Sequence, residues 1–358
     1  MKADFGVRCE GAEPVIYELS KPGRMATSLP ALDVPESELP PAEMLRETVD
    51  LPEVGELDLV RHYVRLSQIN WAIDLGFYPL GSCNMKYNPK VNEAAARLPG
   101  FALTHPYQDN HTVQGNLLLM FELQEMLREI GGFAGMTLQP SAGAHGELTG
   151  LLIMRAYHLD RGDAQRTVVI VPDSAHGTNP ATTTMSGLEV VEVPSDARGN
   201  VDLEALRTLC DERVCGLMLT NPNTLGLFEE RLPEMMELIH GCGGQVYGDG
   251  ANLNSIMGIV KPGDLGFDEM HFNLHKTFSK PHGGGGPGSG PVGVSEPLVP
   301  FLRGPIVERR RCAEAGCDCG SDEEDDEDTI CFHLTMPEKS IGPVKAFYGN
   351  FGVVVRAY

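Results

Sequence analysis

Short apolar segments alternate with longer amphipathic segments through the middle of the chain. The apolar segments are predicted to be strands, at residues 167–172, 188–193, 214–220, 245–249 and 270–274. Segments with a helical spacing of apolar residues lie between them, for example 203–213 and 232–242. This alternation predicts an α/β fold with a mainly parallel sheet that helices cover on both faces.

Polar sequences follow four of the predicted strands, in the order SAHGTNP, NPNTLG, DGANLN and HKTF. The carboxyl ends of parallel strands share one edge of a sheet, and ligands bind beyond that edge in α/β folds. We therefore expect these four loops to converge on one crevice, which is the predicted functional site.

A candidate anion site precedes one further predicted helix. Ser141, Ala142, Gly143 and Ala144 come directly before an apolar helical segment, and separate helices are predicted at 58–75 and 114–130. Small residues leave the N–H groups of a helix N-terminus accessible, and the helix dipole favours an anion such as phosphate there. An ordinary N-cap formed by Ser141 explains the same residues equally well.

Lys276 follows the last predicted strand and precedes the glycine-rich sequence GGGGPGSG. A lysine held away from bulk water has a lowered pKa, and its neutral amine attacks carbonyl groups. Most lysines are solvated surface residues, so the pair His275–Lys276 alone does not indicate a reactive amine.

Composition narrows the functional classes. The chain has 358 residues and a formal net charge of −22, which argues against a nucleic-acid-binding surface. Seven consecutive acidic residues, Asp322 to Asp328, are predicted to be solvated and disordered. The cysteines and the histidine around this run match no common zinc spacing (Cys312, Cys317, Cys319, Cys331 and His333). We expect no membrane span and no signal peptide, and the nine cysteines indicate reduced thiols of a cytoplasmic protein.

Together these features fit a phosphorylated pyridine aldehyde in the crevice. Lys276 would bind the aldehyde, and Asp249 would keep the ring nitrogen protonated. His176 would stack on the ring. The phosphate and the ring hydroxyl are assigned to Ser141–His145, His275, Asn252 and Asn221. Alternatively, Asp249 caps the segment that follows it, and His176 is a structural histidine.

Several motifs resemble one known family. SAGAHGELTG, SAHGTNPA, TNPNTLGLFE, YGDGANLN, NLHKTF and PHGGGGPG are similar to the motifs of the glycine cleavage system P-protein, the glycine decarboxylase that uses pyridoxal 5'-phosphate (PLP). ELSKPGR, LPALDVP and FYPLGSCNMKYNP resemble the second subunit of its two-subunit form. The resemblance covers roughly residues 15–304 and resumes at KSIGPVK, near the end of the chain.

The resemblance implies a fold and a set of site residues. The fold is that of the large domain of PLP-dependent transferases of the aspartate aminotransferase type (fold type I). Lys276 would form the Schiff base with PLP, Asp249 would pair with the ring nitrogen, and His176 would lie over the ring. The implied cofactor-binding set also contains Ser141, Ala142, Gly143, Ala144, His145, Thr224, Asn252 and His275. The implied substrate contacts are Ser82, Asn84 and Asn179, and no metal is expected.

The resemblance also implies an activity and partners. The enzyme would be an oxidoreductase that decarboxylates glycine and transfers the aminomethyl group to the lipoyl group of H-protein. It would assemble with a homologous first subunit, with two copies of each subunit.

Two departures from the family pattern leave alternatives open. Asn84 stands where the family motif reads GSCTMK, and family members continue past Tyr358 into a smaller C-terminal domain. The expected organisation is therefore an arm and helix (1–75), a PLP-binding large domain (76–303), an acidic excursion (304–338) and the start of a C-terminal segment (339–358). Another fold type I enzyme, such as a cysteine desulfurase or an amino-acid decarboxylase, and a non-catalytic scaffold for the first subunit are the alternatives.

Overall fold

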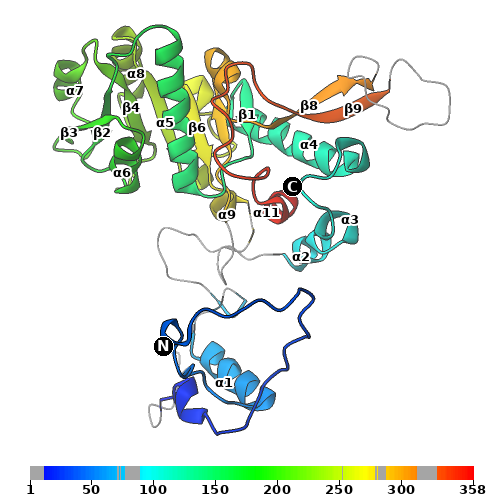
Figure 1. Cartoon of the computed structure of the whole chain (residues 1–358). Coiled ribbons are helices and arrows are strands. Elements are labelled where there is room, and N and C mark those ends of the chain that lie inside the picture. The colour runs from blue at the N-terminus through cyan, green and yellow to red at the C-terminus, as the bar shows by residue number, and fades with distance from the viewer. Residues whose placement is uncertain are drawn as a thin grey trace. The chain divides into compact units, whose positions relative to one another are not determined.

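The computed structural model describes residues 12–70, 72, 74–76, 89–251, 253–278, 280, 288–312 and 329–358. The chain divides into two units, residues 1–79 and residues 80–358 (Figure 1). No helix among the described residues is long and apolar enough to cross a membrane.

The first unit has little regular structure besides one helix. It contains the 3₁₀ turns η1 (Ile16–Leu19) and η2 (Ala42–Met44) and helix α1 (Glu56–Gln68). Glu13 accepts hydrogen bonds from His62 and Arg65 of α1, which ties the N-terminal arm to this helix. The predicted helix over 58–75 is wrong at its C-terminal end, because the Asn70 N–H bonds to the Ser67 carbonyl in a turn. Ile69 and Asn70 are also poorer helix formers than the residues that precede them.

A seven-stranded sheet forms the centre of the second unit. Its strands are β1 (Gly135–Thr137), β2 (Val168–Pro172), β3 (Glu189–Val193), β4 (Val214–Thr220), β5 (Gln245–Gly250), β6 (Glu269–Phe272) and β7 (Val292–Val294). The strand order is β1-β7-β6-β5-β4-β2-β3. All the neighbours from β6 to β3 are parallel, whereas β7 is antiparallel to both β1 and β6. The mainly parallel α/β sheet predicted from the sequence is confirmed.

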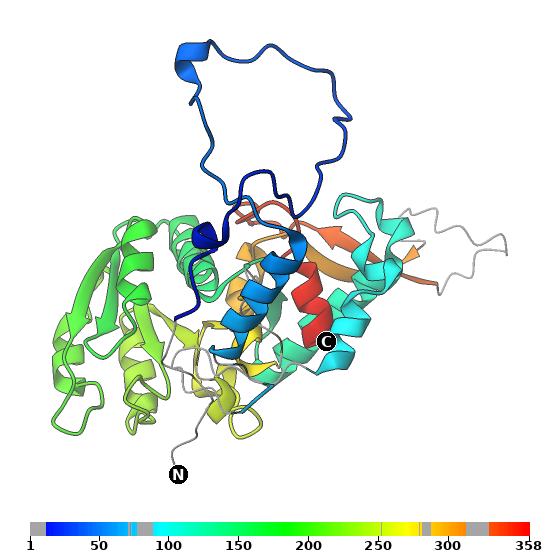
Figure 2. The same cartoon turned by 90° about the horizontal axis from the view of Figure 1, so that it is seen from below.

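Helices cover both faces of this sheet (Figures 1 and 2). They are α4 (Gln114–Gly131), α5 (Gly143–Asp160), α6 (Thr178–Met185), α7 (Leu203–Leu209), α8 (Leu232–Gly241) and α11 (Phe351–Ala357). Apolar residues of α4, α7, α8 and α11 form one core cluster with alternate residues of the strands. Leu151 and Met154 of α5 pack on the opposite face, against Val169 and Met218. The sheet is therefore apolar on both faces, as a parallel sheet between two helical layers must be.

The short elements at the edge of the sheet complete the unit. They are α2 (Lys90–Ala96), α3 (Pro99–Ala102), η3 (Asn110–Thr112), η4 (Leu253–Ser255), η5 (Gly263–Leu265), α9 (Leu274–Thr277) and η6 (Glu296–Phe301). Helix α11, near the end of the chain, packs against α2, α4 and α9. Strands β8 (Ile306–Arg311) and β9 (Ile330–Thr335) pair antiparallel and flank the acidic run.

The last predicted strand needs a correction. The strand expected over 270–274 covers Glu269–Phe272, and Leu274 already begins helix α9. Asn273 is the extended residue between them, at φ −97° and ψ 93°. Lys276 therefore lies in a single helical turn beyond the strand, and not directly at the strand end.

Candidate active site

The predicted carboxylate lies at the carboxyl end of a central strand. Asp249 of β5 is only 4% exposed. It stands in register beside His271 of the parallel strand β6, and 3.6 Å separates Asp249 Oδ1 from His271 Nε2. The Ala251 N–H donates to Asp249 Oδ1 at 3.0 Å. Asp249 is thus fixed by its own turn and by the neighbouring strand.

A second buried carboxyl, Glu147 of α5, lies behind Asp249. It is 4% exposed, and the side-chain amide of Asn179 links the two carboxyl groups. Asn179 Nδ2 donates to Glu147 Oε2 at 2.9 Å and to Asp249 Oδ2 at 3.3 Å. Burial, and then the charge of Asp249, raises the pKa of Glu147 to about 7, and the positive charge of Lys276 opposes this shift. Glu147 is not among the site residues predicted from the sequence, although it belongs to the SAGAHGELTG motif.

His271 is held in place from two sides. Tyr247 Oη lies 2.7 Å from Nδ1, and Asn273 Nδ2 lies 2.6 Å from Nε2. Burial lowers the pKa of His271, so the imidazole is neutral. A neutral imidazole beside Asp249 does not cancel the charge of this carboxylate.

Helix α5 approaches this edge of the sheet closely because it has glycines on its inner face. A Cβ on Gly146 would lie 2.7 Å from the Cβ of His271, and one on Gly150 would lie 2.2 Å from Tyr247 Cε2. Glu147 lies between these two glycines in the sequence. The spacing of small residues therefore places its carboxyl against β5.

Two lysines lie in helix α9 or soon after it. Lys276 in α9 is half-buried, and its charge acts on both Glu147 and His271. Lys280, four residues later, is buried, and burial, followed by the charge of Arg356, lowers its pKa to about 8. The sequence predicts only Lys276 as the reactive amine, so the structure adds Lys280 as a competing candidate.

The predicted phosphate loop precedes α5. Ala142 is the N-cap residue of this helix, and no side chain caps it, so the expectation of a Ser141 cap is wrong. Ser141 Oγ instead lies 3.2 Å from His145 Nδ1, and burial lowers the pKa of His145. An uncapped N-terminus of an 18-residue helix has backbone N–H groups available for an anion.

The loops after β2 and β4 are exposed. His176 is exposed, and its Nδ1 accepts a hydrogen bond from the Thr178 N–H at 3.2 Å. Thr224 is also exposed and donates to the Ser174 carbonyl, which joins the two loops. Both residues lie in loops that leave the same sheet edge as Asp249, as the sequence predicted.

The other predicted site residues either form hydrogen bonds within the protein or lie outside the described residues. His275 is buried and accepts the Ser289 N–H at 3.3 Å, and Asn221 Oδ1 accepts the Glu229 N–H at 3.0 Å. Asn179 is fully buried behind Asp249, which favours a positioning role over the predicted contact with substrate. Ser82, Asn84 and Asn252 lie outside the described residues.

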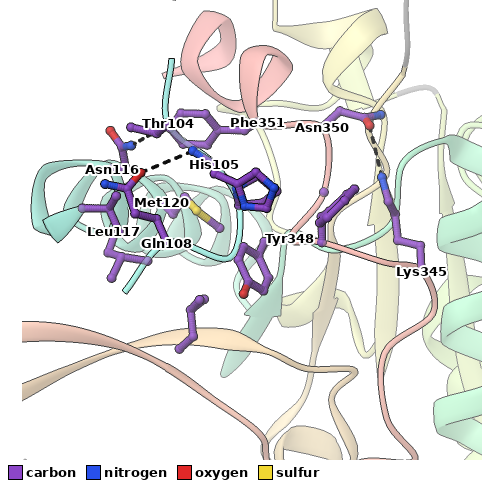
Figure 3. Close-up of a pocket in the computed structure, with 15 residues that line it drawn as sticks. Thr104, His105, Gln108, Asn116, Leu117, Met120, Lys345, Tyr348, Asn350 and Phe351 are labelled. Carbon is purple, nitrogen blue, oxygen red and sulfur yellow. Dashed lines mark hydrogen bonds between the residues drawn. The ribbon is translucent and has the colours of Figure 1, made fainter. Parts of the chain in front are cut away.

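A cavity of about 310 Å³ lies between α4 and the segment before α11 (Figure 3). Leu117, Met120 and Phe351 contribute to its apolar walls. On its polar side, Lys345 Nζ donates to Asn350 Oδ1 at 3.2 Å (Figure 3). The amide of Asn350 then donates to the carbonyls of Ser141 and Gly288, at 3.2 Å and 2.7 Å. The cavity thus adjoins the loop before α5, but none of the predicted site residues lines it.

The part of the chain that the structure describes contains no candidate metal-binding site. No group of three or more His, Cys, Asp or Glu side chains there could hold a metal ion. Cys331 and His333 contact each other on β9, at 3.0 Å between Sγ and Nε2.

Comparisons with known proteins identify the fold and the family. No protein-family model matches the chain. A solved structure of glycine decarboxylase (P-protein) of the glycine cleavage system, in inhibitor-bound form, superposes with a TM-score of 0.68 at 23% identity, over 88% of this chain and 68% of that one. The cysteine desulfurase CsdA from Escherichia coli superposes with a TM-score of 0.53 at 19% identity, over 80% of this chain and 68% of that one. The fold is therefore that of the large domain of PLP-dependent enzymes of fold type I, as predicted.

The sequence comparison is more specific. The probable glycine dehydrogenase (decarboxylating) subunit 2 of Caldanaerobacter subterraneus subsp. tengcongensis is 56% identical over 348 residues, which are 96% of this chain and 68% of that protein. At this identity and coverage, the chain belongs to the glycine dehydrogenase (decarboxylating) subunit 2 family. The family resemblance expected from the motifs is confirmed.

Proposed function

We propose that this chain is a PLP-binding subunit of glycine dehydrogenase (decarboxylating) and acts in glycine cleavage together with a homologous first subunit. The observation that carries the proposal is the 56% identity to a named subunit 2 over 96% of the chain. The designation "subunit 2" supports the existence of a partner subunit. The H-protein as acceptor of the aminomethyl group and two copies of each subunit are the finer parts of the proposal.

The residues present fit PLP. The uncapped N-terminus of α5 suits a phosphate, because its first N–H groups are not used by a cap. Asp249 is buried and fixed, so it suits a protonated pyridine nitrogen. Lys276 carries an amine near this carboxylate, and His176 is exposed in a loop from the same edge of the sheet. When bound, PLP supplies the electron sink that accepts the electrons of the breaking Cα–carboxylate bond of glycine.

The residues of the chain would bind and orient PLP and glycine and would protect the reacting carbon from water. Asp249 would lie at the ring nitrogen, and the Ala251 N–H and the Asn179 amide both donate to its carboxyl group. Lys276 would hold the aldehyde of PLP, and its amine would be available to move a proton at the reacting carbon of glycine. Exclusion of water protects the reacting carbon, and docking of a partner over the exposed His176 loop would provide it.

Covalent attachment of PLP tests the assignment of the lysine. The chain is mixed with PLP, reduced with borohydride and digested, and the labelled peptide is identified by mass spectrometry. We expect the label on Lys276. Lys276→Ala should abolish it, and Lys280→Ala should retain it. A label that persists on Lys280 in the Lys276→Ala variant would contradict the assignment.

Isotope exchange tests the activity. Together with the first subunit and lipoylated H-protein, the chain should exchange the carboxyl carbon of glycine with labelled bicarbonate. Release of sulfur from cysteine in place of this exchange would favour a cysteine desulfurase. Stable complex formation with the first subunit, without any PLP binding, would favour a scaffold. The free thiols of the described Cys210, Cys215 and Cys242 are consistent with the proposed cytoplasmic location.

A further inference from the structure

Three buried polar side chains, Glu147, Asn179 and Asp249, form a connected group behind the proposed ring-nitrogen site. We propose that Glu147 is a positioning residue that carries a proton, donates it to the Asn179 side-chain oxygen, and so leaves Asp249 as the single negative charge of the group. This inference rests on the proposed function, because PLP is the ligand that Asp249 would serve.

Counting donors and acceptors shows that the group needs one more proton. The Asn179 amide nitrogen has two hydrogens, and it uses one for each carboxyl group, at 2.9 Å and 3.3 Å. Asn179 Oδ1 is buried and has no hydrogen-bond donor within the described part of the chain. Two ionised carboxylates would therefore place two charges and one unsatisfied acceptor in the same dry region, which is costly. A proton on one carboxyl group removes a charge and supplies a donor.

The surroundings favour Glu147 as the carrier of this proton. Asp249 accepts a backbone N–H from Ala251 in addition to the Asn179 amide, and both bonds stabilise its ionised form. Glu147 accepts from Asn179 and, at 3.5 Å, from the Thr182 hydroxyl. Its pKa of about 7 agrees with this choice, since burial and the charge of Asp249 raise it.

The other titratable groups that face Glu147 do not replace this proton. The charge of Lys276 lowers the pKa of Glu147 but does not outweigh burial. Burial raises the pKa of Tyr247 well above its ordinary value, so its hydroxyl stays protonated. His271 is neutral because burial lowers its pKa.

A protonated Glu147 would determine which way the Asn179 amide points. An amide and a carboxylic acid form two complementary hydrogen bonds, from the amide N–H to one oxygen and from the acid O–H to the amide oxygen. This pairing orients the second hydrogen of Nδ2 toward Asp249. Asp249 then receives a fixed donor and remains charged for the ring nitrogen.

Unfolding of the chain without PLP tests where the proton is. The folded chain retains the Glu147 proton up to about pH 7, whereas the unfolded chain releases it near the ordinary value of 4.5. Wild-type stability therefore falls as the pH rises through this window. Glu147→Gln carries a permanent amide donor in place of the proton, so its Tm relative to wild type should increase by roughly 5 °C between pH 5 and pH 7.5. The exposed Glu192→Gln is the control and should parallel wild type.

Infrared spectroscopy detects the Glu147 proton independently of unfolding, so it serves as a second test if aggregation distorts the melting curves. A protonated carboxyl band at pH 6 should be present in wild type and reduced by one group in Glu147→Gln. Parallel Tm profiles for wild type and Glu147→Gln, or an unchanged carboxyl band, would overturn the inference.

PLP binding separates the positioning role from the proposed function. Glu147→Gln should bind PLP within about threefold of wild type, and Glu147→Ala should bind at least tenfold more weakly, because Asn179 loses its partner. Glu229→Gln removes a buried carboxyl outside the group and should bind like wild type. If Glu147→Gln binds as poorly as Glu147→Ala, its charge matters and the inference is wrong. If wild type binds no PLP, the proposed function fails, and the unfolding and infrared results still decide where the proton is.

Discussion

Two sides of the candidate site differ in how far the folded chain organises them. On one side, the buried wall consists of Asp249, Glu147, Asn179 and His271, and each of these side chains has hydrogen-bond partners from other elements. On the other side, the side chains of His176 and Thr224 are exposed and bond to nearby backbone groups, although Asp173 and Asn223 tie their loops to the rest of the unit. The folded chain therefore fixes the buried carboxyl groups of the candidate site. The positions of the exposed His176 and Thr224 side chains depend more on what binds there.

The physical reason is the cost of burial. A carboxylate inside the protein must find donors within the chain, because water cannot supply them. Such a group is therefore already in place before a cofactor arrives. An exposed imidazole has no such requirement, because water can hydrogen-bond to it.

The largest expected effect concerns the charge in the buried wall. Asp249→Asn should weaken PLP binding by about 100-fold, which corresponds to about 3 kcal/mol, because an amide cannot pair ionically with a protonated ring nitrogen. PLP titration followed by absorbance measures this change. Equal PLP affinity of both proteins would show that the carboxylate does not face the ring nitrogen.

The next prediction concerns the close contact between α5 and β5. Gly150→Ala should lower the free energy of unfolding by about 1–3 kcal/mol, because its Cβ would lie 2.2 Å from Tyr247 Cε2 and this ring is fully buried. Chemical denaturation measures the change. Gly115→Ala in α4 is the matched control, since nothing lies within 4 Å of its Cβ. It should gain up to about 1 kcal/mol from helix propensity. Similar stabilities of both variants would mean that α5 can move away from the sheet.

The smallest expected effect is on the exposed loops. His176→Ala should change the free energy of unfolding by less than about 0.5 kcal/mol, because the side chain is exposed. Its PLP affinity should fall by about 1 kcal/mol, or roughly fivefold, through the loss of ring stacking. Denaturation and PLP titration on the same preparation give both values. A large loss of stability would show that the loops are organised as firmly as the buried wall.

The sequence predicted more of the fold than of the site. The strands over 167–172, 188–193, 214–220 and 245–249 lie within one residue of the observed ones. The central strands β2 and β4 are buried on both faces and are therefore continuous apolar segments, whereas the edge strand β3 is only partly buried. The helix over 203–213 ends earlier, at Leu209, and Cys210 is extended. Such ends depend on tertiary contacts that local spacing does not contain.

Lys280 and Glu147 show why parts of the site were missed. Lys280 follows Lys276 by four residues, and sequence gives no measure of burial, so the lysine whose pKa burial lowers was not considered. Glu147 lies inside a motif whose small residues and histidine predict a phosphate site, and nothing in the motif indicates a role for its carboxyl group. Only the position of α5 against β5 reveals that its carboxyl faces Asp249.

The sequence by itself determined the alternation of strands and helices, the family and the residue types at the strand ends, because periodicity and motifs are local properties of the chain. The tertiary structure alone decided which of these side chains are buried together. The sharing of the Asn179 amide between Glu147 and Asp249 brings together residues that are 32 and 70 positions away from it in the chain. Burial and charge at such distances arise only when helices pack on the sheet, and these two quantities set the protonation of the site.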